Sequence, residues 1–205
     1  MRRLSMIPIV HSRHDLGSLE GPINALKATL FSPQSIVTTR VAIDHFWQAI
    51  FDGLRRSDFD FPNLYVYQDG LPTTGDPHQG IELRIVEDLA SKGSQNHRII
   101  QWLLQQNAAL VGTESVDLLM EEYELARRFV TKGLHVHDAD DDRVSLSNSI
   151  RERRDQFIAT RIHQTLSPDR HGLIFLGLLH RLEAVLPDDI RVDYPFGRPR
   201  SAFSA

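Results

Sequence analysis

The sequence predicts an α/β fold, with a mainly parallel sheet of about five strands and helices on both of its faces. Short apolar runs that suit buried strands alternate with segments of helical period. The runs are continuously apolar, which is typical of parallel strands covered on both sides. With 205 residues, of which 41% are hydrophobic and 24% charged, the chain can build one substantial core. We therefore expect a single α/β domain over residues 1–205, with a short irregular tail at 195–205.

The apolar runs place the expected strands at 6–10, 63–68, 108–112, 173–177 and 190–194. Helical periodicity predicts helices over 40–56, 81–93, 94–107, 115–133 and about 148–166, and a short helix after 177. Ser94 is expected to cap a helix, whereas Gly93 and Gly133 end helices. The charged segment 135–143 is expected to be a solvated loop, because it lacks the spaced ligands and the glycine of a calcium-binding loop.

Composition and charge exclude several kinds of site and partner. The chain has no cysteine, so disulfides, thiolate metal sites and cysteine nucleophiles are ruled out. A net charge of -4 argues against sequence-independent nucleic-acid binding, which needs clustered Lys and Arg. No apolar run approaches the ~20 residues that span a bilayer, and neither a glycine-rich phosphate loop nor Gly-x-Ser-x-Gly is present. We expect a cytoplasmic protein that binds a small molecule and contacts no membrane. Nucleic-acid binding is disfavoured, and the segment 150–156 is the one place where a local basic patch would be compatible with the sequence.

Polar side chains follow the expected strands. Because the carboxyl ends of parallel strands share one edge of a sheet, where ligands bind, we expect these side chains to form one site. They are His11, Arg13, His14 and Asp15 after the first strand, Gln68 and Asp69 at the second, Glu114 after the third, and His180 after the fourth.

One helix-strand unit carries a family resemblance. Arg154–Asp155 lie early in a helix, Ile158–Ala159 follow them, and the next strand ends in the Gly-x-x-His motif of Gly177–His180. Over 153–180 the chain resembles the superfamily of erythromycin esterases, haem-binding ChaN proteins and Tiki/TraB-like proteins. Its members commonly carry an Arg-Asp or Arg-Asn pair, a Met-Ala step and a strand ending in Gly-x-x-His.

The resemblance is weaker outside this unit. The superfamily usually has Gly-x-x-His or Gly-Glu-x-His after its first strand, whereas this chain has "HSRH". His14 therefore matches the motif's histidine, but His11 replaces its glycine. Glu114 could stand where those proteins place an acidic residue at a strand end. The resemblance implies a shared fold more strongly than a shared substrate.

Two kinds of chemistry would suit the histidines. His11 and His14, together with His180 and either Asp15 or Glu114, would form a nitrogen and oxygen ligand set suited to Zn, Mn or Fe. In the structural alternative, His14 and Asp15 form a turn and a helix cap. Without a metal, His180 would act as a general base or acid, because imidazole titrates near neutral pH and a carboxylate can orient it.

The remaining polar residues would orient the histidine or bind the substrate. Asp155 or Glu114 would be the carboxylate that orients the His180 ring. Arg154 and Arg13 are expected to hold an anionic or carbonyl group, with Gln68 and Asp69 also at the binding edge. The structural alternative for Arg154–Asp155 is a buried ion pair that ties the helix to the strand ends.

Two function classes follow from these residues. In the first, the protein is a hydrolytic enzyme in which His14, His180 and a carboxylate activate water directly or through a divalent metal. In the second, it is a non-catalytic module that binds a small ligand or another protein with the same edge. The amphipathic helix 115–132 and the tail "FGRPRS" would then serve assembly, including a homo-oligomer. If the protein is an enzyme, we expect the His and carboxylate groups to lie in one cleft, to be hydrogen-bonded to one another and to have perturbed pKa values. If it is a binding module, we expect structural partners to satisfy all the hydrogen bonds of the same groups.

Overall fold

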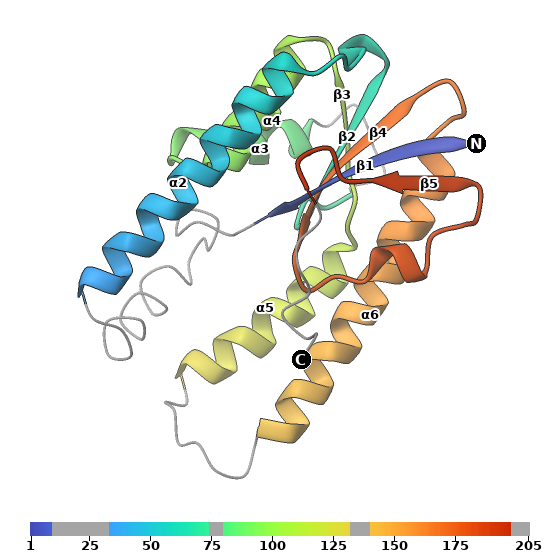
Figure 1. Cartoon of the computed structure of the whole chain (residues 1–205). Coiled ribbons are helices and arrows are strands. Elements are labelled where there is room, and N and C mark those ends of the chain that lie inside the picture. The colour runs from blue at the N-terminus through green and yellow to red at the C-terminus, as the bar shows by residue number, and fades with distance from the viewer. Residues whose placement is uncertain (10–32, 74–79, 132–139, 198–205) are drawn as a thin grey trace.

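A five-stranded parallel sheet forms the centre of the molecule (Figure 1). A computed structural model describes residues 1–9, 33–73, 80–131 and 140–197. Neighbouring strands lie in the order β3-β2-β4-β1-β5, and each pair is parallel. The predicted α/β fold is therefore confirmed. The strands are β1 (Arg2–Ile9), β2 (Leu64–Gln68), β3 (Ala109–Val111), β4 (His171–Gly177) and β5 (Ile190–Asp193).

Helices cover both faces of this sheet. One face packs against α2, α3 and α4, with Trp47, Val86 and Ile100 among the buried side chains. The other face packs against α6 through Ile158 and Ile162. The helices are α2 (Pro33–Arg56), α3 (Ile81–Ser91), α4 (Gln95–Gln105), α5 (Val116–Thr131) and α6 (Asp140–Thr165), with short 3₁₀ turns at η2 (Phe61–Asn63) and η3 (Leu182–Ala184). None of the described helices is long and apolar enough to cross a membrane.

The alternation of side chains along β1 explains how one strand serves two cores. Successive side chains of a strand point to opposite faces of a sheet. Leu4 and Met6 accordingly belong to the core under α6, whereas Ile7 and Ile9 belong to the core under α2 and α4. Full burial of an aliphatic side chain contributes about 1.5–3 kcal/mol. Two-sided burial therefore favours a position for β1 inside the sheet, between β4 and β5.

The helices α5 and α6 lie side by side and extend past the sheet (Figure 1). Side-chain burial along α6 changes at Ile150. The side chains from 144 to 149 are exposed or half-buried, whereas Ile150 is buried and is followed by the buried residues that face the sheet. The sheet-facing part of α6 begins close to Arg154 and Asp155, so this pair lies near the carboxyl edge of the strands.

Several elements begin earlier than predicted. β1 starts at Arg2, because the buried Arg2 guanidinium binds Asp189 and the carbonyl oxygens of His163 and Leu166. A strand beginning with a buried arginine cannot be predicted from an apolar pattern. Helix α2 likewise begins at 33, before the predicted 40.

The prediction of a loop over 135–143 is wrong for residues 140–143. Residues 140–143 belong to α6, and 135–139 lie outside the described residues. Acidic residues suit the first turn of a helix because the helix dipole is positive there. A run of aspartates is therefore as compatible with a helix start as with a loop. The predicted tail is irregular at 195–197, where Phe196 packs against the α2 core beside Gly53.

Candidate functional site

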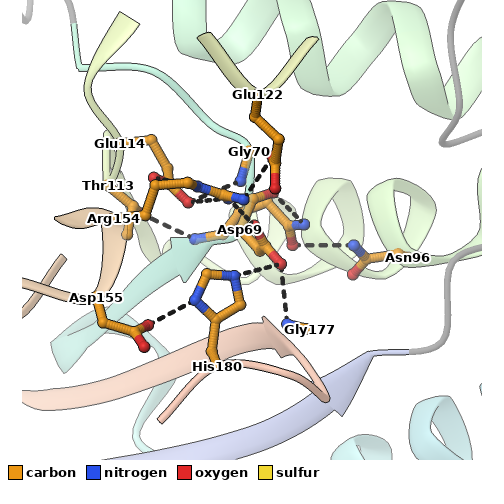
Figure 2. A network of polar contacts seen from close by, with 11 residues as sticks. Asp69, Gly70, Asn96, Thr113, Glu114, Glu122, Arg154, Asp155, Gly177 and His180 are labelled. Carbon is orange, nitrogen blue, oxygen red and sulfur yellow. Dashed lines mark hydrogen bonds and ion pairs between the residues drawn. The ribbon is translucent and has the colours of Figure 1, made fainter. Parts of the chain in front are cut away.

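A buried cluster of charged groups lies at the carboxyl edge of the sheet (Figure 2). Asp69 follows β2, Glu114 follows β3 and His180 follows β4, while α6 supplies Arg154 and Asp155. These side chains come from four separate parts of the chain and meet in one network. The shared edge predicted from the polar strand ends is therefore present for β2, β3 and β4.

Arg154 lies at the centre of the network. Its Nη2 donates to Asp69 Oδ1 and Glu114 Oε1 at 2.5 Å each, and its Nε donates to Glu114 Oε2 at 3.2 Å. Its Nη1 donates to Glu122 Oε2 at 2.7 Å, which brings α5 into the network. Burial alone would lower the pKa of Arg154, but the bond to Glu114 and the charges of the carboxylates raise it above its usual value. Arg154 is therefore a buried cation held by three carboxylates.

Backbone pairing after β3 brings Glu114 into this position. Thr113 N and Glu114 N both donate to Leu71 O at 3.0 Å, and Thr73 N donates to Glu114 O at 2.8 Å. Gly112 permits this approach, because a Cβ there would lie 2.8 Å from Pro72 O and from Thr73 Cα. The Glu114 side chain is fully buried as a result. Burial raises the pKa of Glu114, and the Arg154 guanidinium only partly opposes that rise.

His180 reaches the network through a tight turn after β4. The turn is closed by His180 N donating to Gly177 O at 3.1 Å. Gly177 N in turn donates to Asp69 Oδ2 at 2.9 Å, so the same turn is bonded to the end of β2. Figure 2 shows the imidazole between Asp155 and Asp69. The segment that resembles the Gly-x-x-His motif thus places its histidine among the carboxylates.

The two ring nitrogens of His180 differ in their contacts with the described residues. Nδ1 lies 2.5 Å from Asp155 Oδ1, and because a carboxylate accepts, Nδ1 carries the hydrogen. Asp155 is held in turn by Arg181 N, which donates to Oδ2 at 2.9 Å. Nε2 lies 3.6 Å from Asp69 Oδ2 and makes no hydrogen bond with the described part of the chain. Burial acts to lower the pKa of His180, but the Asp155 bond and the Asp69 charge outweigh it and raise the pKa.

Gln68 and Asn96 extend the network from Asp69 towards α4. Gln68 Nε2 donates to the backbone oxygen of Asp69 at 2.9 Å, and Asn96 Nδ2 donates to Gln68 Oε1 at 2.9 Å. Gln68 N donates to Thr113 Oγ1 at 3.1 Å. The Gln68 side chain is therefore buried and used within the protein, and its amide supports Asp69.

The structure brings together all six of the predicted site residues that it describes. Arg154, predicted to bind substrate, has its charge compensated by carboxylates, which matches the alternative of a buried ion pair. Among the described residues, no group of three His, Asp or Glu side chains could hold a metal ion. The predicted residues that meet are Gln68, Asp69, Glu114, Arg154, Asp155 and His180. His11, Arg13, His14 and Asp15, which include most of the predicted metal ligands, lie outside the described residues.

Two members of the network were not predicted. Glu122 lies on the amphipathic helix α5, where a glutamate on the polar side carries no signal that it binds a buried arginine. Asn96 lies in the first turn of α4, where a polar residue is expected at a helix start. Only the positions of α5 and α4 beside the strand ends distinguish these two residues from ordinary surface residues.

A second polar cluster on the sheet contains serine, histidine and aspartate. Ser5 Oγ donates to Asp193 Oδ1 at 2.5 Å and lies 2.8 Å from His171 Nε2. Because the serine hydrogen is directed to Asp193, His171 must donate to Ser5. In a nucleophilic triad the histidine accepts from the serine and is oriented by the carboxylate. Ser5 is also only 1% exposed, so this cluster has the bonding and burial of a structural group.

Comparison of the chain with protein-family models, curated proteins and solved structures finds no significant match.

Proposed function

We propose that the protein is a hydrolase in which His180 is the general base. The observation that carries this proposal is the Asp155–His180 hydrogen bond, which fixes the ring, while Nε2 makes no hydrogen bond to the residues that the structure describes. A general base needs an unprotonated nitrogen within reach of the reacting water and a partner that holds its orientation. The resemblance of 153–180 to the erythromycin esterase superfamily supports the same assignment.

The surrounding charges suit proton transfer to His180 Nε2. Asp155 accepts from Nδ1 and so selects the tautomer whose Nε2 carries the lone pair. When Nε2 takes a proton from water, the imidazolium lies between Asp155 and the Asp69 carboxylate, 3.6 Å away. Both negative charges stabilise that cation, which agrees with the raised pKa of His180. The carboxylates therefore favour the protonated state that the base reaches during the reaction.

The charge of the site indicates the kind of substrate. Among the described residues, the network combines four carboxylates, from Asp69, Glu114, Glu122 and Asp155, with one guanidinium and one imidazole. Even with the imidazole protonated, acidic groups outnumber basic ones. We therefore propose a neutral or cationic substrate, and not the anionic one that was an alternative when Arg13 and Arg154 were expected to hold an anionic or carbonyl group. Arg154 then positions Asp69 and Glu114 and does not bind the substrate.

The free nitrogen of His180 and the nearby Asp69 carboxylate also fit a divalent metal ion. An imidazole nitrogen and a carboxylate oxygen are common ligands of Zn, Mn and Fe. Among the described residues they would supply two ligands. Elemental analysis of purified wild-type protein and of His180→Gln tests the metal-dependent form of the proposal. Near-stoichiometric metal that is lost in His180→Gln would show that His180 is a ligand, and this result would contradict its role as a free base.

Turnover measurements test the general-base role directly. The wild type is assayed against p-nitrophenyl esters, a p-nitrophenyl phosphate and amino-acid p-nitroanilides. For any substrate that is hydrolysed, His180→Gln should lower kcat by about 10²–10⁴-fold, which is the usual contribution of a general base. His171→Gln is the control, because this half-buried histidine belongs to the separate Ser5 cluster. Equal turnover in the wild type and His180→Gln would overturn the proposal.

The Asp155→Asn variant tests whether the negative charge of Asp155 contributes to the reaction, because it removes the charge and keeps the size of the side chain. An asparagine keeps the size of the side chain but does not carry the charge that stabilises an imidazolium. The variant should lose most of the activity that His180→Gln loses, and its pH-rate profile should shift because the pKa of His180 falls. An unchanged profile would show that Asp155 has no part in the reaction. If no substrate is turned over by the wild type, the non-catalytic binding module becomes the better assignment.

A further inference from the structure

The side-chain amide of Asn96 has a defined orientation and one unsatisfied atom. Gln68 Nε2 donates to a backbone carbonyl of Asp69, so Gln68 must present its Oε1 to Asn96. Since Oε1 only accepts, Asn96 presents Nδ2 to it. The Asn96 Oδ1 atom therefore points elsewhere. It is buried and finds no hydrogen-bond partner among the described residues.

An unsatisfied acceptor in this position needs an explanation. Buried polar atoms in folded proteins are nearly always hydrogen-bonded, because leaving one unpaired costs its full desolvation energy. Asn96 as a whole is only 2% exposed, so bulk water does not compensate for the missing bond. A hydrophobic residue at this position would avoid the cost of the unpaired oxygen. A donor that is not part of the described chain would satisfy the oxygen.

The unsatisfied oxygen lies beside the candidate active site. Figure 2 shows Asn96 on the side of Asp69 opposite to Arg154. Asn96 is connected to Asp69 through the side chain of Gln68. The Asp69 side chain itself lies beside the free nitrogen of His180. Asn96 therefore lies at the same edge of the sheet as His180, and the Gln68 side chain and Asp69 lie between them.

We infer that Asn96 Oδ1 is a substrate-recognition group that accepts a hydrogen bond from an N–H of the bound molecule. This inference rests on the proposed function for the identification of that molecule as a substrate. It deepens that proposal by naming the class, which is a neutral molecule or a cation carrying an amide or amine N–H. The acidic surplus of the network favours the same class, because a donor group carries positive charge on its hydrogen.

A pair of small probes tests the inference without a known substrate. Acetamide has an N–H donor, whereas N,N-dimethylacetamide has the same carbonyl and no donor. Both are titrated into ¹⁵N-labelled protein, and the side-chain amide of Asn96 and the backbone amide of Gly177 are followed by NMR. Acetamide should shift both signals with saturation, at an affinity at least several-fold higher than that of N,N-dimethylacetamide. Equal responses, or none, would indicate that a bound water satisfies Oδ1 and would overturn the inference.

Variants identify the atom that responds. Asn96→Leu should lose the preference for acetamide at the Gly177 signal. Gln95→Leu is the matched control, because this neighbouring amide on α4 is bonded to Asp44 at the surface and should leave the preference unchanged. If Asn96→Leu does not fold, the comparison of the two probes on wild-type protein still decides the matter.

A further variant separates this inference from the proposed function. His180→Gln should abolish hydrolysis and still bind acetamide in preference to N,N-dimethylacetamide. Selective binding by a wild type that hydrolyses nothing would mean that the hydrolase proposal fails while Asn96 remains a recognition group. Hydrolysis without selective binding would mean that the inference about Asn96 fails alone.

Discussion

Arg154 is the residue on which the order of the site depends. Its side chain is 5% exposed, and the Asp69 and Glu114 side chains that bind it are 6% and 0% exposed. Taking charges out of water is costly, and only their mutual attraction and good hydrogen bonds compensate for it. The fork of the guanidinium supplies those bonds to three carboxylates at once. Without Arg154, Glu114 would be buried with no counter-charge among the described residues, and Asp69 would have only the His180 imidazole beside it.

Replacement of Arg154 by methionine should therefore be strongly destabilising. We expect a loss of about 3–5 kcal/mol in the free energy of unfolding, which is the usual cost of removing one partner of a buried ion pair. Urea unfolding measures the loss. Arg153→Met is the matched control, because the neighbouring arginine binds Glu121 at the surface and its removal should change little. Adding Glu114→Gln to Arg154→Met should recover part of the lost stability. Similar losses in the two single variants would contradict the central role of Arg154.

The protonation of His180 should make stability depend on pH. Its folded-state pKa is raised above the ordinary value of 6.5, so the folded protein binds the proton more tightly than the unfolded chain does. The resulting stabilisation is fully present below pH 6.5, and it is lost as the pH rises through the folded-state pKa of His180. Glu114 acts with the same sign from a lower ordinary pKa of 4.5. Stability should therefore fall as the medium becomes alkaline.

Urea unfolding at a series of pH values tests this dependence. In Asp155→Asn the neutral amide no longer favours the imidazolium, so the fall in stability above neutral pH should become smaller. Asp188→Asn is the control, because that aspartate is exposed and lies outside the network. A fall of equal size in Asp155→Asn and the wild type would show that His180 does not cause it.

At the scale of elements, Gly112 controls how closely the end of β3 approaches the segment after β2. A Cβ at Gly112 would meet backbone atoms of Pro72 and Thr73 at 2.8 Å. A Cβ at Gly172 would meet Leu4 Cδ1 at 2.7 Å, which is the end of a flexible side chain. Backbone that is held by hydrogen bonds moves less easily than a leucine methyl group. The same added methyl should therefore be more harmful at Gly112.

We expect Gly112→Ala to cost about 3 kcal/mol and Gly172→Ala about 1 kcal/mol, within the range for overpacked sites. Gly112→Ala should also displace Glu114 and weaken its bond to Arg154. Thermal unfolding compares the two stabilities, and the Arg154 side-chain NMR signals report the displacement. Equal costs, with unchanged Arg154 signals, would show that the approach at Gly112 is not required.

Much of the fold could be predicted at this scale, because strands and helices have local patterns. The run that forms β4 and the turn to His180 are examples, since a buried parallel strand and a Gly-x-x-His segment are both visible in the sequence. The strand order is not local. The side-by-side position of β2 and β4 brings Asp69 within reach of His180, and no periodicity encodes that neighbourhood. The partners of Arg154 were unpredictable for the same reason.

Over the whole molecule, burial is unevenly distributed between the sheet and the helices that extend past it. The strands and the sheet-facing part of α6 contain many fully buried side chains. From Val116 to Arg128 of α5, none is fully buried, and the same holds for residues 144–149 of α6. Local stability follows local burial, because segments with few buried contacts open without unfolding the rest. Helix α5 contacts Arg153 and Arg154 through Glu121 and Glu122, which lie in its amino-terminal half.

Amide hydrogen exchange should therefore show two levels of protection. Amides of β1, β2 and β4 should exchange only through global unfolding, whereas those in the second half of α5 and in 144–149 of α6 should open at about 2–3 kcal/mol less. Exchange measured at increasing urea concentrations separates the two, because global opening exposes more surface and depends more steeply on urea. Glu122→Gln, which weakens the bond from α5 to Arg154, should lower the protection of α5 more than that of β1. A single level of protection throughout would mean that α5 and α6 unfold together with the sheet, and that the Arg154 network couples the extended helices to the core.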